Sequence, residues 1–248
     1  MPLHCSEIKL IPQLSISGQS NDNIFYDSAN EGKIHDLVAI ISPSLRLTSR
    51  TERLNASLQS MLQRIEYHDQ KDLDATDQFH AGRIGYSLTP NMNISADARY
   101  AKDSQIDRDI ETTGRVFGAS TRKREHYGCG ANAALNEKTS FSTSYAYDKD
   151  TFNNPDYYDS TIQNISLTLA HNLDALVSQT TVRLTPGYAL YDYPDTDVTS
   201  YSLMAGASKR ITYVIDISAD MGSQVARTKN ILFDSFEQRE KTRWFIGH

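Results

Sequence analysis

The sequence predicts an all-β protein: an antiparallel up-and-down transmembrane β-barrel of about twelve strands, formed by residues 1–248 as one domain. Three observations predict it. Apolar and polar residues alternate along most of the chain, and tight links alternate with long polar links. The mean hydropathy is −0.51 and no run of eighteen apolar residues occurs, so the sequence contains no candidate transmembrane helix. A spanning strand needs only about 9–11 residues, and every second one can face water, so barrels have a low average hydropathy.

The alternation is clearest at 91–101. There Met92 and Ile94 fall on one face of an extended chain, while Asn93 and Ser95 fall on the other. The stretch at 53–66 also fits a helical stripe, but we interpret it as a strand because its neighbours are strands. The predicted strands are 7–17, 37–48, 53–66, 78–88, 91–101, 126–136, 139–148, 164–169, 181–190, 200–208, 212–221 and a short one starting at 242.

Links of two lengths alternate between these strands, as in outer-membrane barrels with short periplasmic turns and long external loops. Soluble β-sandwiches and solenoids are the alternative. Sandwich strands are usually about 5–6 residues long, shorter than these, and no solenoid repeat recurs. The tight links are 49–52, 89–91, 136–138 and 209–211, and the link at 171–178 is a little longer. The long links are 18–35, 67–75, 102–123, 148–159, 191–198 and 222–241.

The N-terminus and the cysteines add two expectations. The start at Met1 has neither the basic nor the apolar part of a signal peptide, so we expect a mature form, a truncated reading frame or a fragment. Cys5 and Cys129 have no CxxC spacing and no nearby histidine, so neither reads as a metal ligand or nucleophile. The net charge of −6 argues against a nucleic-acid partner.

The N-terminal third carries a family resemblance. Its pattern begins with a strand at Leu14–Ser17, followed by the stretch Asn21–Phe25. A second strand begins at Asp36-Leu37 and contains Ile41-Ser42-Pro43, and Arg53-Leu54 follows it. It resembles the outer-membrane β-barrel porin family associated with exopolysaccharide and PEP-CTERM loci, specifically over 8–60. The resemblance implies an outer-membrane barrel linked to polysaccharide secretion, with no established catalytic residues to carry over.

Candidate catalytic and metal-binding residues are weak, and we predict that the protein is not an enzyme. A phospholipase-like barrel would need serine and histidine on adjacent strands facing lipid, and no such grouping with His80 or His126 is visible in the sequence. Asp22, Asn23 and Asp27 lack EF-hand spacing and favour a turn over a cation site. We therefore predict no catalytic, cofactor or metal residues.

The predicted function is a passive pore or an export-associated component for hydrophilic solutes in the cell outer membrane. The alternative is a non-conducting structural or interaction barrel at the cell surface. Outer-membrane lipid, lipopolysaccharide and an oligo- or polysaccharide are the expected partners, and the oligomeric state is not predicted. The residues predicted to line the lumen are Arg46, Asn93, Asp97, Arg99, Asn132, Arg183, Asp216 and Asp220.

Overall fold

The computed structural model describes residues 7–24, 34–104, 121–155, 157–230 and 239–247. It has twelve strands in these ranges and a short 3₁₀-helix, η1, at Lys71–Leu73. The strands are β1 (Glu7–Asn21), β2 (Asp36–Arg50), β3 (Leu54–Tyr67), β4 (Ala75–Thr89), β5 (Met92–Ser104), β6 (Thr121–Ala134), β7 (Thr139–Phe152), β8 (Ser160–Asn172), β9 (Thr180–Tyr193), β10 (Thr196–Arg210), β11 (Asp216–Asn230) and β12 (Arg239–Gly247).

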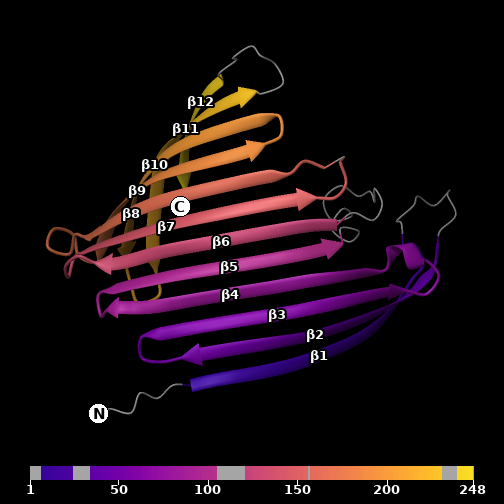
Figure 1. Cartoon of the computed structure of the whole chain (residues 1–248). Coiled ribbons are helices and arrows are strands. Elements are labelled where there is room, and N and C mark those ends of the chain that lie inside the picture. Colours follow the sequence, from indigo (N-terminus) through magenta and orange to yellow (C-terminus); the bar gives the residue numbers. More distant parts are fainter. Residues whose placement is uncertain (1–6, 25–33, 105–120, 156, 231–238, 248) are drawn as a thin grey trace. The chain divides into compact units, whose positions relative to one another are not determined.

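The strand order follows the chain from β1 to β12, as Figure 1 shows. The registers place apolar residue against apolar residue. Leu14 pairs with Pro43 across β1 and β2, and Leu203 pairs with Pro186 across β10 and β9. This confirms the predicted all-β, up-and-down antiparallel fold. The ambiguous stretch at 53–66 is a strand, because its even positions continue the apolar row of β2.

Two predicted boundaries are wrong. The predicted long link at 191–198 is a tight hairpin, because Tyr193 pairs with Thr196 and only two residues connect β9 to β10. The polar residues Asp192 and Asp197 suggest a loop, but they alternate with aromatic and branched residues inside β9 and β10. In addition, β11 begins at Asp216 and not at 212, so Tyr213 lies in the turn before it. The Ile211 N–H donates a hydrogen bond of 2.9 Å to the Ile215 carbonyl across this turn.

Within the described ranges, the chain forms two compact units. The first contains 1–84, 98–126 and 150–158, and the second contains 85–97, 127–149 and 159–248. Among the residues whose burial the structure describes, the buried apolar side chains are Ile24, Val38 and Leu73. Large exposed apolar side chains lie on the strands instead, such as Leu14, which is 62 % exposed, and Met221, which is 59 % exposed. Among the described residues, no helix is long and apolar enough to cross a membrane.

Candidate functional site

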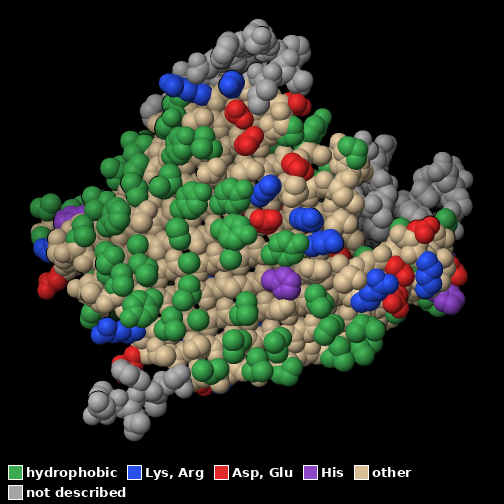
Figure 2. Space-filling view, viewed as in Figure 1, with side chains coloured by type: hydrophobic (Ala, Val, Ile, Leu, Met, Phe, Trp, Pro, Cys, Tyr) green, Lys and Arg blue, Asp and Glu red, His purple; other side chains and the backbone are tan. Residues whose placement is uncertain are grey.

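Each strand separates its side chains onto two faces, which we call the apolar face and the polar face. On β2, Leu45 belongs to the apolar face and Arg46 to the polar face, and the pairing of Arg46 with Gln59 carries the polar face to β3. In the second unit, Leu203 and Leu184 mark the apolar face. Hydrophobic side chains are spread across the visible side of the sheet in Figure 2. An exposed apolar face of this kind needs lipid to cover it.

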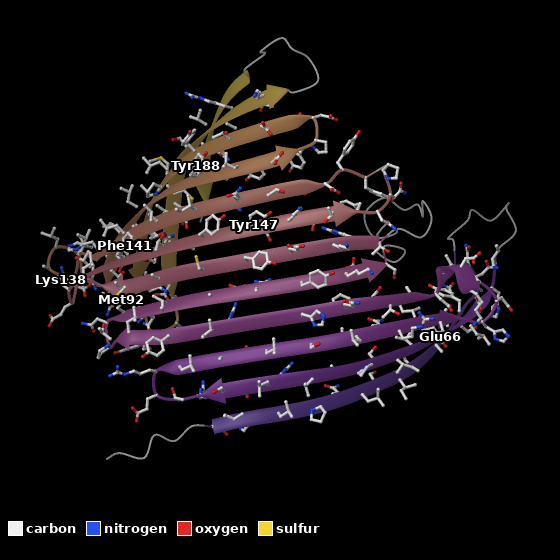
Figure 3. All side chains as sticks on the ribbon, viewed as in Figure 1. Glu66, Met92, Lys138, Phe141, Tyr147 and Tyr188 are labelled. Carbon is white, nitrogen blue, oxygen red and sulfur yellow. The ribbon has the colours of Figure 1, made fainter. Side chains whose placement is uncertain are left out.

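In each of the two units, taken by itself, pairs of aromatic rings mark a boundary of the apolar face. His80 stacks on Tyr100 with ring centroids 6.0 Å apart in the first unit. In the second unit, the ring centroids of Tyr188 and Tyr201 lie 5.1 Å apart. A third pair joins Tyr127 and Tyr147. Figure 3 labels Tyr147 on β7 and Tyr188 on β9, well along the strands from their short-turn ends.

The boundary fits a membrane interface. On β5 the apolar face runs from Met92 through Ile94 to Tyr100, and Lys102 follows on the same face. Eight residue steps correspond to about 26 Å along the strand, or about 20 Å once a tilt of ~40° is allowed, close to the ~25 Å apolar band of outer-membrane barrels. On β3 the row likewise changes to charge at Arg64. The strands therefore extend several residues beyond the lipid at their long-link ends.

A paired charge lies on the polar face of the second unit. Arg183 on β9 donates two hydrogen bonds to the carboxylate of Asp220 on β11, from Nε at 3.0 Å and from Nη2 at 2.5 Å. These strands are not neighbours, because β10 lies between them and places Gly206 opposite both residues. A Cβ at Gly206 would approach the Arg183 Nε to 2.7 Å and would overlap the Asp220 carboxylate. The absence of a side chain at 206 therefore makes room for the ion pair.

Hydroxyl and amide groups cover much of the same face. The hydroxyl oxygens of Ser144 and Ser166 are hydrogen-bonded at 2.8 Å. The side-chain amide of Gln224 donates a hydrogen bond to the Ser200 hydroxyl at 2.7 Å. The threonine hydroxyls of β8 and β9, at 168 and 185, lie 3.0 Å apart. These contacts make the polar face of the second unit hydrophilic.

The residues predicted to line the lumen lie on the polar face of their strands, and an ion pair joins Arg183 to Asp220. Asp216 pairs with Arg210 at 3.1 Å, and Arg46 donates to Gln59 at 3.2 Å. A Cβ at Gly130 would lie 3.7 Å from the Ser95 hydroxyl, so these two residues share the polar face. Every second residue of a strand lies on the same face, which assigns Asn93, Asp97 and Arg99 on β5 and Asn132 on β6 to the polar face as well. Whether they line an open lumen stays a prediction.

Other sequence candidates are placed as follows. Cys129 is a free, exposed thiol on the apolar face, and Cys5 lies outside the described residues. The Asn23 N–H bonds the Asn21 side chain at 3.0 Å, as an Asx turn does, and Asp27 lies outside the described residues. In the described part of the chain, no group of three His, Cys, Asp or Glu side chains could hold a metal ion.

A serine–histidine pair was missed by the sequence analysis. The Ser60 hydroxyl on β3 lies 2.9 Å from His80 Nδ1 on β4, on the apolar face of the first unit. The two residues are twenty positions apart, and only the register of β3 against β4 brings them together. That register depends on the 67–75 link, which contains η1, so the sequence offered no direct signal.

A buried carboxylate organises the long-link end of the first unit. Asp36 is fully buried and accepts the backbone N–H groups of Leu37 at 2.7 Å and Gln70 at 2.8 Å. The N–H groups of His68 and Asp69 also donate to it, each at 3.0 Å. Burial raises the pKa of Asp36, but these four hydrogen bonds outweigh burial and hold the pKa below its ordinary value of 3.8. Ile24, Leu73 and Tyr67 pack together nearby.

We expect Asp36→Asn to loosen the link at 67–75 without unfolding the strands, because an amide accepts fewer and weaker hydrogen bonds than a carboxylate. Hydrogen exchange at His68, Asp69 and Gln70 should be faster in the variant than in the parent at neutral pH. A depressed pKa contributes stability above pH 3.8 that is lost as the pH falls below it, so the difference should shrink in acid. Asp69→Asn, at an exposed carboxylate, is the control; equal exchange in parent and Asp36→Asn would contradict the assignment.

Comparison with known proteins shows the fold. No family model matches the sequence, and no curated protein matches it. The structure is similar to the alcaligin outer-membrane receptor FauA from Bordetella pertussis, with a TM-score of 0.56 and 11 % identity over 98 % of this chain and 40 % of that one. It is also similar to the siderophore receptor PirA from Pseudomonas aeruginosa, with a TM-score of 0.51 and 13 % sequence identity. This match covers 95 % of this chain and 39 % of the receptor.

The chain therefore spans about 40 % of the length of the receptors that it matches. The fold is that of the β-barrel proteins of the bacterial outer membrane, and the apolar face with its aromatic boundary is the lipid-facing surface that an outer-membrane location requires.

Proposed function

We propose that this chain forms a narrow polar pore for hydrophilic solutes in the outer membrane, serving the export of an oligo- or polysaccharide. The observation that carries the proposal is the polar face, where the Arg183–Asp220 pair lies beside rows of hydroxyl and amide groups. Paired charges leave little net field, so uncharged hydroxylated solutes suit the face better than ions. A barrel of about twelve strands would enclose a lumen narrower than that of the sixteen-stranded porins.

The link to exopolysaccharide rests on the resemblance of residues 8–60 and on this hydroxyl-rich face. Lipopolysaccharide is the expected neighbour at the long-link ends of the strands, where Lys102 and Lys123 follow the aromatic boundary on the apolar face. These partners are proposals, as is a passive mode of transport.

The alternative is a non-conducting barrel that displays a binding surface. The ordered segment around Asp36, where Ile24 and Leu73 pack together and four backbone N–H groups bind one carboxylate, favours it.

Ion selectivity tests the pore. Arg183→Gln removes the guanidinium that binds the Asp220 carboxylate and should shift the selectivity of the pore towards cations. Asp220→Asn leaves the guanidinium and should shift it towards anions, as should neutralising Asp97 or Asp216, because the shift follows the charge that remains beside the path. The measurement is the reversal potential of folded protein in planar bilayers under a salt gradient.

Lys209→Gln is the matched control, because it removes the same charge as Arg183→Gln from the apolar face near a turn. The double variant Arg183→Gln with Asp220→Asn should return close to the parent. Folded protein that conducts no ions would favour the structural alternative, and so would conductance with selectivity that all of these substitutions leave unchanged.

A further inference from the structure

A hydrogen-bonded serine and histidine lie on the surface that faces lipid. Ser60 and His80 come from adjacent strands, and their side chains meet at 2.9 Å on the apolar face. When the imidazole proton is on Nε2, Nδ1 accepts the hydrogen of the Ser60 hydroxyl, which is the arrangement of a nucleophile and its general base. The stacked ring of Tyr100 fixes the plane of the imidazole.

The surroundings of the pair fit a lipid tail. Leu58 and Leu62 lie two residues before and two residues after Ser60 on the same face, 52 % and 44 % exposed. Gly82 follows His80 on the same face of β4, and a Cβ placed there would meet only the Leu58 side chain, at 3.8 Å. The position beside the imidazole is therefore open and apolar.

The depth of the pair fits a lipid ester. The pair lies at the aromatic boundary, where the ester groups of membrane lipids are found, between the acyl chains and the headgroups. Lys102 lies two residues beyond Tyr100 on the same face, about 7 Å further along the strand towards the long-link end. An ammonium group at that height could hold the phosphate of a glycerophospholipid whose ester carbonyl reaches Ser60.

We propose that Ser60 and His80 form a hydrolytic site for the acyl esters of glycerophospholipids in the outer leaflet. His80 takes the proton of the Ser60 hydroxyl as its oxygen attacks the ester carbonyl. The bond to the glycerol oxygen breaks, the imidazolium returns the proton to that oxygen, and a lysophospholipid leaves. Water, deprotonated by His80, then attacks the acyl carbon, the bond between that carbon and the Ser60 oxygen breaks, and the imidazolium returns the proton to the Ser60 oxygen as the fatty acid leaves. The activity is independent of the proposed pore.

The test uses the full chain folded into vesicles of phosphatidylglycerol and phosphatidylethanolamine. A fluorophosphonate probe should label Ser60, identified by peptide mass, and the vesicles should release fatty acid. Ser60→Ala should abolish both. His80→Ala should slow labelling by roughly 10²–10⁴-fold, the usual contribution of a general base. Lys102→Gln should slow hydrolysis of the phospholipid while leaving the rate of probe labelling unchanged.

Ser57→Ala is the matched control, because Ser57 lies on the same strand but on the polar face, and it should behave as the parent. A shift in gel mobility on heating verifies that each variant is folded. Folded parent protein that leaves Ser60 unlabelled overturns the proposal, and so does fatty acid release that persists in Ser60→Ala, since a contaminating lipase would then be its source. In either case, the pair would only satisfy two polar groups at the membrane interface.

Discussion

Arginine at position 94 is expected to destabilise the barrel by about 2–4 kcal/mol, the cost of placing its charge near the bilayer midplane on a lipid-facing position. Ile94 is 39 % exposed on the apolar face of β5, and it lies six residue steps before the aromatic boundary at Tyr100. Ile94→Arg places a guanidinium at a depth where neither water nor lipid headgroups solvate it. The measurement is the free energy of unfolding of protein folded into lipid vesicles, from reversible denaturant titration.

Ser95→Arg is the matched control. Ser95 is the next residue on the same strand but lies on the polar face, where Asp97 follows on the same side. Its substitution should cost far less, so the difference between the two variants measures which face meets lipid. Equal costs at 94 and 95 would contradict the assignment of the two faces.

A side chain at position 206 is expected to separate Arg183 from Asp220. A Cβ at this position would overlap the Asp220 carboxylate and approach the Arg183 Cγ to 3.1 Å, so Gly206→Ala must displace both side chains. Overpacking of this kind costs roughly 1–3 kcal/mol. Gly18→Ala is the control, because a Cβ at Gly18 would meet no atom within 4 Å.

A double-mutant cycle checks the mechanism. If Gly206→Ala acts by separating the ion pair, then Arg183→Gln should cost less stability in the Gly206→Ala background than in the parent. The measurement is again the free energy of unfolding in vesicles. Strictly additive costs would show that residue 206 acts on the backbone alone.

Much of the fold could be predicted from the sequence, because one period-2 pattern specifies both the strand and the face of each residue. That Leu203 and Pro186 lie on the same face follows from that pattern, whereas their pairing across β9 and β10 is a register that the structure shows. Link lengths were predicted less well, because polar residues occur both in loops and at the long-link ends of strands that extend beyond the lipid. Asp192 and Asp197 thus belong to the β9–β10 hairpin and not to a long loop.

The candidate sites were only partly predictable. Arg183 and Asp220 were both placed on the polar face, but their pairing spans β10 and depends on Gly206, which the sequence shows only as one small residue among others. Ser60 and His80 meet through a register that no local pattern specifies. The burial of Asp36 depends on backbone N–H groups more than thirty residues away, a long-range arrangement that alternation does not encode.

The strand order bears on how the chain folds. Each strand pairs with the strands next to it in sequence, and β9 and β10 are joined by two residues only. Closing so short a link has a small entropic cost, and an isolated hairpin forms within about 1–10 μs, far faster than pairings between distant segments. The β9–β10 hairpin, like the β4–β5 hairpin that two residues also connect, is thus suited to form early, before its neighbouring strands pair with it.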